Sequence, residues 1–356
     1  MKRLLTGLLA AAFLGGASLK AASVAKTLDI YFIDVEGGQA TLIVTPSGES
    51  FLVDGGFPGD GTFNSTPGDP AVARDAQRVL AAARDAGITQ IDHLLITHFH
   101  ADHFGAVMEL SRLLPIKEFI DHAAPSAAAD SAVPGTMALY RAYAAVRSTG
   151  THRQPKAGDQ LHFKDVTLDV LASDGQVRGT PVSGAGAPNT ACASGGVPAQ
   201  EKLENPLSTA VRFTYGQFRF LDVGDLSGAP LHALTCPVNL IGESELYLIA
   251  HHGGADGADP ALFTAVKPLV AVFNNGPRKG AQPQTFATLR QMPSIDAWQL
   301  HRATYPTADN LPDARIVNLD LSTNAWLKVS AQADGAFTVT NGRTGEAKSY
   351  RRTASH

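Results

Sequence analysis

The chain has 356 residues, of which 44% are hydrophobic and 17% are charged, and its formal net charge is −4. This composition excludes an intrinsically disordered chain and is sufficient for one large folded domain or two ordinary ones. The slightly negative charge argues against a protein that coats nucleic acid through an overall basic surface.

The N-terminus has the pattern of a secretory signal peptide. Lys2 and Arg3 precede an apolar stretch, residues 4–17, which is shorter than the roughly 20 apolar residues that a membrane-spanning helix needs. We therefore expect residues 1–23 to be removed, and an uncleaved membrane anchor is the less favoured alternative. The mature protein would be periplasmic or secreted, have no transmembrane segment and carry a charge of −7 (−4 − 3), because Lys2, Arg3 and Lys20 would be lost.

Alternating strands and helices follow in chain order. A helix is predicted to have Asp69 as its N-cap, Pro70 as its first residue and Gly87 after its end. A second helix is predicted over residues 104–114. Runs rich in Ile, Val, Phe and Thr predict strands over residues 30–35, 40–45, 50–53, 91–97 and 116–120. This order predicts an α/β fold built in layers.

The second half is less regular. A helix is predicted over residues 137–146, and residues from about 174 to 206, rich in Gly, Ser, Ala and Pro, predict a long surface loop. Asp334-Gly335 predicts the turn of a β-hairpin. Further strands are predicted over residues 210–221, 246–250, 269–273 and 316–321. The expected domains are a main domain, 24–320, with a surface insertion at about 123–206, and a C-terminal β-hairpin extension, 321–356.

The two cysteines, Cys192 and Cys236, do not form a CxxC motif and lie far in the sequence from the histidine cluster at residues 98–103. In an exported protein they are predicted to form a disulfide or to be two free buried thiols. A zinc-binding role is less favoured than either.

Four candidate metal ligands lie within six residues, straight after a predicted buried strand: His98, His100, Asp102 and His103. Residues two apart in an extended segment point the same way, so His98 and His100 can hold one metal ion. The chain then turns toward a helix, which lets Asp102 and His103 face a second position. Imidazole and carboxylate ligands suit zinc, so this cluster predicts a metal site rather than a solvated polar loop.

The segment His98-Phe99-His100-Ala101-Asp102-His103 resembles the HxHxDH signature of the metallo-β-lactamase superfamily. The resemblance implies a four-layer αββα sandwich and a hydrolase that binds two zinc ions per chain. It also implies roles for residues later and earlier in the chain: Asp225 as the carboxylate that bridges the two metals, His251 or His252 as the last histidine ligand, and Asp54 as a structural aspartate. His252 is slightly favoured over His251, because it directly precedes Gly253.

More narrowly, the chain resembles the hydrolase domain of the ComEC/Rec2 competence family. The matching segments lie between residue 29 and about residue 280 and are residues 34–40, 44–48, 54–56, 224–225 and 250–253. As an ordered set they are specific for the fold and not for a substrate. The chain has no multi-spanning membrane region, so the resemblance does not imply a DNA-uptake channel.

The chain departs from these families at two places. Gln39 stands where the competence-type loop usually carries an aspartate, and no histidine stands where the superfamily supplies a third histidine to the first metal. The candidates for this third ligand are Asn205, Ser208, His122 or a water, with His152 and His162 less favoured. The first metal site is therefore expected to be the weaker one.

A polar segment follows the strand predicted at 269–273. Asn275, Arg278 and Lys279 are predicted to bind an anionic group of the substrate, such as a phosphate or carboxylate. A solvated basic turn is the alternative.

Together these observations predict an exported zinc-dependent hydrolase. Two zinc ions could share a water and lower its pKa to about 7, and Asp102 or a bound water would pass a proton to the leaving group. The competence-type resemblance implies a phosphodiester or related ester as the substrate. The alternatives are a lactonase or β-lactam hydrolase on the same fold and, in another class, a non-catalytic metal-binding adaptor. The native metal (zinc, manganese or iron) and the oligomeric state stay open.

Overall fold

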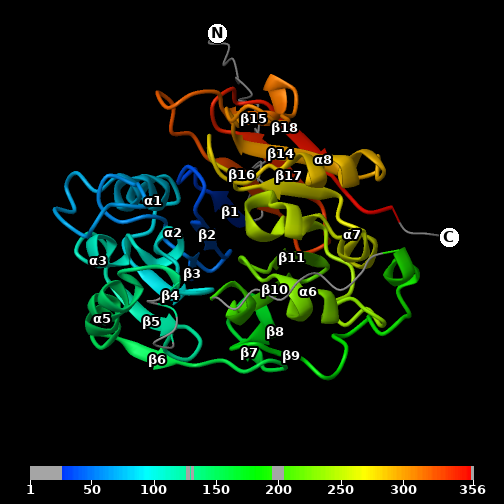
Figure 1. The fold of residues 1–356 in the computed structure, drawn as a ribbon, viewed down its shortest axis with the longest axis horizontal. Helices are drawn as coiled ribbons and strands as arrows, with labels where there is room; N and C mark the ends of the chain where they lie inside the picture. Colours follow the sequence, from blue (N-terminus) through cyan, green and yellow to red (C-terminus); the bar gives the residue numbers. More distant parts are fainter. Residues whose placement is uncertain (1–25, 126–128, 130–131, 195–203, 354–356) are drawn as a thin grey trace, which may run out of the picture.

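Two large mixed β-sheets pack face to face and helices cover their outer faces (Figure 1). This architecture is seen in a computed structural model that describes residues 26–125, 129, 132–194 and 204–353. The signal peptide predicted for residues 1–23 lies outside the described residues. No helix among the described residues has the length and apolar character to cross a membrane.

The first sheet has nine strands among the described residues, in the order β18-β17-β16-β1-β2-β3-β4-β5-β6. Neighbours from β18 to β3 are antiparallel, whereas β3, β4, β5 and β6 run parallel. The strands are β1 (Leu28–Phe32), β2 (Thr41–Val44), β3 (Ser50–Val53), β4 (Ile91–Leu95), β5 (Ile116–Ile120), β6 (Thr151–Arg153), β16 (Leu327–Ala331), β17 (Phe337–Asn341) and β18 (Ala347–Tyr350).

The second sheet has the order β15-β14-β13-β12-β11-β10-β8-β7, and β9 pairs with β8 beside this path. Strands β11 to β15 run parallel, so their carboxyl ends meet at one edge of the sheet. The strands are β7 (Gln160–His162), β8 (Thr167–Ser173), β9 (Gln176–Val177), β10 (Ala210–Tyr215), β11 (Phe218–Asp222), β12 (Leu246–Leu248), β13 (Val270–Phe273), β14 (Asp296–His301) and β15 (Ile316–Asn318).

Helices cover the outer face of each sheet. Those over the first sheet are α1 (Arg74–Asp85), α2 (Ala101–Phe104), α3 (Val107–Leu110) and α5 (Thr136–Arg147). Those over the second are α6 (Gly228–Ala233), α7 (Pro260–Val266) and α8 (Pro283–Arg290). Short 3-10 turns complete the described elements: η1 (Thr190–Ser194), η2 (Asn205–Leu207), η3 (Ala250–Gly253), η4 (Ala255–Ala258) and η5 (Asp313–Arg315).

The side-chain alternation of the strands builds three apolar layers. In β3, Phe51 and Val53 belong to the core between the two sheets, whereas Leu52 packs in the core under the helices of the first sheet. In β12, Leu246 and Leu248 face the inter-sheet core and Tyr247 faces the helices of the second sheet. Successive residues of a strand point to opposite faces, so strands buried on both faces are apolar throughout. The predicted α/β fold of four layers in the order αββα is confirmed.

The start of α1 was predicted wrongly. The helix begins at Arg74 with Ala73 as its N-cap, and Asp69 instead forms a turn in which its side chain accepts a hydrogen bond from the backbone of Ala71 at 2.9 Å. The reason is tertiary: the guanidinium of Arg74 contacts Glu36 and Asp75, and its backbone N–H donates to the carbonyl of Gly59 at 2.8 Å. These contacts outweigh a local capping preference of about 1 kcal/mol.

Two segments that were expected outside the main body contribute strands to it. Within the range expected as a surface insertion, β8 is almost entirely buried and pairs with β10 in the second sheet. Within residues 321–356, the hairpin predicted at Asp334-Gly335 joins β16 to β17, and β16 pairs with β1. The first sheet therefore takes three neighbouring strands at one of its edges, β16, β17 and β18, from the end of the chain.

Cys192 and Cys236 form a disulfide between η1 and the segment after α6, across 44 residues of sequence. We expect a Cys192→Ser/Cys236→Ser double variant to lose about 2–4 kcal/mol of unfolding free energy, because the crosslink limits the unfolded chain. Urea unfolding with and without reductant measures this loss. The reductant should lower the unfolding free energy of the wild type to that of the variant and leave that of the variant unchanged. Equal urea midpoints for the oxidised and the reduced wild type would contradict the prediction.

Candidate metal centre

Asp54 organises the loop that follows β4. Its carboxylate accepts hydrogen bonds from the backbone of Thr97 at 2.8 Å and from the Thr97 hydroxyl at 2.7 Å, and it lies 2.7 Å from Nδ1 of His103. Asp54 itself adopts a left-handed backbone conformation, with φ of 58°. The hydrogen bond fixes the orientation of the His103 ring and leaves its Nε2 pointing at the centre.

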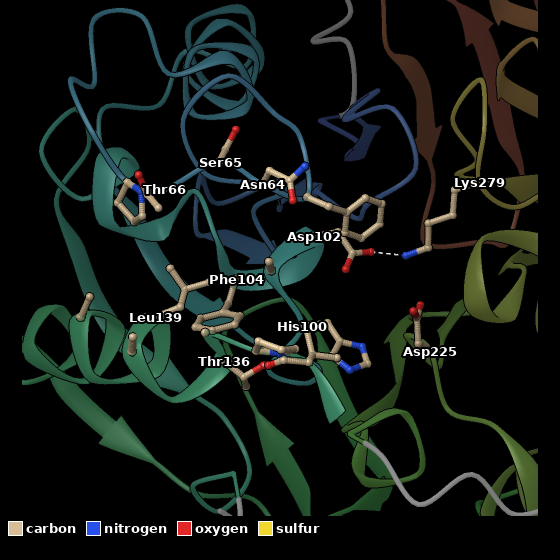
Figure 2. A pocket seen from close by; sticks show the side chains of 18 of the residues that line it. Asn64, Ser65, Thr66, His100, Asp102, Phe104, Thr136, Leu139, Asp225 and Lys279 are labelled. Carbon is tan, nitrogen blue, oxygen red and sulfur yellow. Dashed lines mark hydrogen bonds and ion pairs between the residues drawn. The ribbon is translucent and has the colours of Figure 1, made fainter. Parts of the chain in front are cut away.

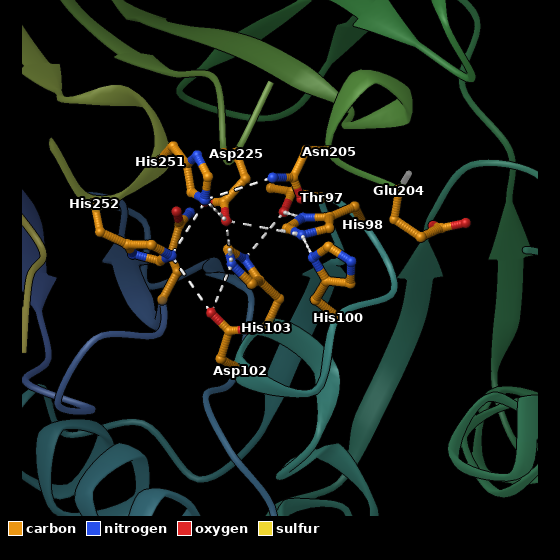
Figure 3. Close-up of polar contacts among 12 residues, drawn as sticks. Thr97, His98, His100, Asp102, His103, Glu204, Asn205, Asp225, His251 and His252 are labelled. Atoms are coloured by element: carbon orange, nitrogen blue, oxygen red, sulfur yellow. Dashed lines mark hydrogen bonds and ion pairs between the residues drawn. The ribbon is translucent and has the colours of Figure 1, made fainter. Parts of the chain in front are cut away.

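Asp102, His103, Asp225 and His252 form a compact group of four buried side chains (Figure 3). Each offers one potential ligand atom, and these atoms lie within 4.8 Å of one another. Nε2 of His252 lies 3.2 Å from Oδ1 of Asp225 and 3.4 Å from Oδ2 of Asp102. Nε2 of His103 lies 3.3 Å from a carboxylate oxygen of each aspartate.

The ligand atoms of this group fit a divalent cation. Nε2 of His103, Nε2 of His252 and Oδ1 of Asp225 are buried and have no hydrogen-bond partner in the described part of the chain. Leaving a buried polar atom unpaired costs about 1–3 kcal/mol, so three such atoms that converge indicate a missing common partner. Two imidazoles and two carboxylates are a donor set suited to zinc.

His98 and His100 lie on the other side of Asp225. Nε2 of His98 is 2.9 Å from Nδ1 of His100 and 3.9 Å from Oδ2 of Asp225. Burial lowers the pKa of His98 well below its usual value, and the neighbouring His103 and His100 lower it further; burial also lowers the pKa of His100. Neutral imidazoles keep the lone pair that a metal ion requires.

Buried charge at the centre is balanced between acids and bases. Burial opposes the ionisation of Asp102, but Lys279 and His103 outweigh it and hold its pKa well below the usual range. Burial likewise opposes the ionisation of Asp225, whose pKa His252, His103 and His251 hold low. Both carboxylates are therefore ionised at neutral pH, as metal ligands must be.

The backbone of the histidine doublet is unusual. His251 and His252 both adopt left-handed conformations, with φ of 51° and 56°, and Gly253 follows with φ of 76°. A side chain at Gly253 would collide with the ring of Phe273. Left-handed residues other than glycine are uncommon, cost about 1–3 kcal/mol each when strained and cluster at functional sites.

Both imidazoles of the doublet reach Asp225. Nε2 of His251 lies 3.6 Å from Oδ2 of Asp225, and its Nδ1 lies 2.7 Å from Oδ2 of Asp256. Burial opposes protonation of His251, but Asp225 and Asp256 outweigh it and raise its pKa to about 9. The structure thus brings all seven predicted metal ligands to one centre.

The candidates for a third ligand of the first metal lie at different places. Nδ2 of Asn205 is 3.5 Å from Nε2 of His251, at the centre. His122 packs on Phe99, with ring centroids 4.7 Å apart, and its Nε2 lies 3.4 Å from a carboxylate oxygen of Glu204. Ser208 is buried in the segment before β10. His152 contacts Asp121, and His162 is exposed on β7.

Gln39 supports the loop of the centre rather than the ligand set. Its backbone N–H donates to the carbonyl of Asp102 at 3.0 Å, and its side-chain amide donates to Asp222 at 2.8 Å. Gly38 allows this close approach, because a side chain there would collide with the carbonyl of Asp102. Burial, assisted by the charge of Asp54, raises the pKa of Asp222 to about 7.

A cavity of about 680 Å³ opens beside the metal centre (Figure 2). Its floor is formed by His100, Asp102, Asp225 and His251, and its walls by the loop after β3, by α5 and by the residues just before α5. These walls are mostly apolar. Its size is within the range of about 300–1,000 Å³ that small-molecule sites have. The apolar side chains of its lining include Phe63, Pro67, Phe104, Val133, Pro134 and Leu139.

The three predicted substrate-binding residues separate in the structure. The ammonium of Lys279 lines the cavity, contacts the carboxylate of Asp102 and lies 5.6 Å from the ring centroid of Phe63. Arg278 is exposed and does not line the cavity. Asn275 is buried and donates to the carbonyls of His301, at 2.7 Å, and Gly276, at 3.0 Å. Its contacts are therefore with the protein backbone.

The cavity walls were not found from the sequence. The helix α5 was predicted, but its periodicity does not say that Thr136 and Leu139 face a metal centre. The loop that carries Phe63 has no pattern that marks a binding residue. Asp256, whose carboxylate contacts His251, lies five residues after His251 and four after His252. A carboxylate so near two candidate ligands was the one available sequence signal for this contact.

Comparison with known proteins gives one family. A model described as "Metallo-beta-lactamase superfamily" matches residues 33–186. Among curated protein sequences, none matches this chain.

Several solved structures have a similar fold. A mutant metallo-beta-lactamase from Cronobacter sakazakii is 16% identical, with 55% of this chain and 60% of that chain covered and a TM-score of 0.32. YhfI, a metallo-beta-lactamase fold protein from Bacillus subtilis, is 11% identical, with 79% and 98% covered and a TM-score of 0.46. CmlA, a diiron beta-hydroxylase from Streptomyces venezuelae, is 13% identical, with 77% and 53% covered and a TM-score of 0.45. The chain thus spans less than two thirds of the length of the first and the last of these.

The hydrogen bond that Nδ1 of His103 donates to Asp54 should strengthen metal binding. We expect Asp54→Asn to weaken zinc binding about 10–100-fold, because the amide removes the charge that orients the imidazole. Asparagine tolerates the left-handed backbone at this position, so the fold should persist. Competition with a chromophoric chelator measures the affinity. Asp92→Asn is the matched control, since Asp92 lies at the other end of β4 and contacts Ser50 and Lys117. Equal affinities of the two variants would show that Asp54 does not act on the ligand.

Proposed function

We propose that this chain is a member of the metallo-beta-lactamase superfamily, whose model matches residues 33–186, and that it is a zinc-dependent hydrolase that cleaves a small ester. The observation that carries the proposal is the buried group of Asp102, His103, Asp225 and His252, in which unpaired atoms of His103, His252 and Asp225 converge beside a cavity that Asp102 and Asp225 line. His98 and His100 beside this group support a second ion. When bound, two zinc ions would lower the pKa of a water and polarise the ester.

The residues of the chain would supply positioning and charge. Asp102 and Asp225 stay ionised and hold the imidazoles around them. Lys279, paired with Asp102, places one ammonium in the cavity, where it would stabilise negative charge that develops on an ester oxygen. It is also a nearby proton source for a leaving group, a role that the sequence had suggested for Asp102.

The cavity walls favour a substrate with an apolar part. Four large apolar side chains among the described residues are exposed, and two of them, Phe63 at 65% and Val133 at 38%, line this cavity. Apolar side chains exposed around a concave site indicate ligand binding. We therefore favour a lactone or another small carboxylic ester, or the cyclic amide of a β-lactam.

A phosphodiester is the second candidate. The resemblance of residues 34–40 and 250–253 to the ComEC/Rec2 family supports it, and Lys279 could pair with a phosphate oxygen. A nucleic-acid polymer is less favoured, because its backbone requires several cations and Lys279 is the one Lys or Arg side chain in the described lining.

We also propose that the protein is exported. The signal-peptide pattern of residues 1–23 supports this, and so does the disulfide between Cys192 and Cys236, because such bonds persist in oxidising compartments.

Metal content and a substrate panel test the proposed function together. We expect the purified protein to hold about two zinc ions per chain and to cleave one class among chromogenic lactones, β-lactams, carboxylic esters and phosphodiesters. Chelation should abolish this activity and zinc should restore it. His100→Ala should lower kcat/KM by about 100-fold or more, because it removes a ligand. His152→Ala is the control, since His152 contacts Asp121 outside the cavity. If the protein binds metal but has no activity that His100→Ala abolishes, it would be a non-catalytic metal-binding adaptor instead.

The neighbours Arg278 and Lys279 offer a matched pair of variants. We expect Lys279→Met to lower kcat/KM about 100-fold, because it removes a preorganised positive charge from the cavity. Arg278→Met should leave kcat/KM unchanged, because Arg278 is exposed outside the cavity. Steady-state kinetics on the substrate found in the panel compares them. Equal losses in the two variants would mean that the basic turn acts through its overall charge.

A further inference from the structure

We propose that His251 and His252 bind two different metal ions, so that the doublet replaces the histidine that the first site lacks. His252 would belong to the site of Asp102, His103 and Asp225. His251 would complete the site of His98 and His100, with Asp225 between the two sites. This inference rests on the proposed binuclear function and assigns a ligand that the sequence left open.

The distances around Asp225 support this division. Oδ1 of Asp225 faces His252, whose Nε2 lies 3.2 Å away. Oδ2 faces His251 at 3.6 Å and His98 at 3.9 Å, and it also lies 3.3 Å from His103. His251 and His98 therefore share one oxygen of Asp225, whereas His252 approaches the other (Figure 3).

Burial divides the doublet in the same way. The side chain of His252 is fully buried and does not line the cavity, whereas that of His251 is 24% exposed and lines it together with His100 and Asn205. The two ring centroids are 5.9 Å apart, with the ring planes 60° apart. Two consecutive left-handed residues thus direct adjacent imidazoles to different sides of one carboxylate.

His251 is held as a metal ligand would be. Its Nδ1 lies 2.7 Å from the carboxylate of Asp256, so its Nε2 is the atom presented to Asp225. The arrangement repeats that of His103, whose Nδ1 lies 2.7 Å from Asp54. A carboxylate behind an imidazole fixes the tautomer and the ring orientation of metal-binding histidines.

The other candidates for the third ligand are less suited. Asn205 reaches the centre, but its side chain lies against His251, 3.5 Å from Nε2, and a neutral amide is a weaker zinc ligand than an imidazole. His122 is packed on Phe99 and faces Glu204. Among these candidates, His251 is the imidazole whose Nε2 faces the same oxygen of Asp225 as His98.

Zinc stoichiometry in paired variants tests the assignment. Full-length mature protein is stripped with chelator, reloaded with Zn²⁺, desalted and analysed for zinc and protein. We expect about two ions in the wild type and about one in His251→Ala. His251→Ala/His98→Ala should still hold about one ion, because both changes affect the same site. His251→Ala/His103→Ala should hold none, because they affect both sites. Asn205→His in the His251→Ala background should restore the second ion, and His232→Ala, outside the centre, should keep both.

The outcomes separate the possibilities. Two ions in His251→Ala would overturn the assignment, and so would loss of both ions in His251→Ala/His98→Ala with one retained in His251→Ala/His103→Ala. A wild type that binds two ions but cleaves no ester would instead contradict the proposed function and leave the assignment testable by stoichiometry alone. Far-UV circular dichroism and thermal unfolding of each stripped variant show whether it is folded. Restoration of the second ion by Asn205→His in the His251→Ala background is a gain of binding, which misfolding cannot produce.

Discussion

The buried carboxylate of Asp225 is the interaction on which the centre depends. Its oxygens lie within 4 Å of imidazole nitrogens of His98, His103, His251 and His252, two from each sheet's loops. An unpaired carboxylate so deeply buried would be strongly destabilising. The parallel pairing of β11 with β12 places the loops of Asp225 and the doublet at one sheet edge, opposite the loop after β4. The two sheets must therefore pack together for the imidazoles to surround and balance the charge of Asp225.

The sequence predicted those strands and candidate ligands whose determining residues lie close together along the chain. The cluster from His98 to His103 is a local pattern, and β12 is apolar and buried throughout, so its sequence identifies it as a strand. The N-cap of α1 could not be predicted, because Arg74 is held by Glu36 and Asp75 from other parts of the fold. For the same reason the sequence did not separate Lys279 from Arg278: their roles differ only in what lies opposite them.

Under the proposed function, the residues that select the substrate would lie apart from the residues that would hold the metal. The ligands come from the loops at the ends of β4, β11 and β12, whereas the cavity walls come from the loop after β3 and from α5 (Figure 2). One scaffold could therefore keep a metal chemistry while Phe63, Val133 and Leu139, which line the cavity, would set which group is accepted beside it. This separation would explain why motifs that resemble those of the superfamily do not indicate a substrate.

The strain of the doublet is best explained by the ligands that it presents. Two left-handed residues in succession disfavour folding by about 1–3 kcal/mol each, and glycine at either position would relieve that cost. The close packing of Gly253 against Phe273 and the hydrogen bond of His251 to Asp256 hold the turn in place without requiring an imidazole at both positions. A single histidine followed by glycine would suffice for one ion. Two adjacent imidazoles, aimed at opposite oxygens of Asp225, have a purpose if there are two ions to hold.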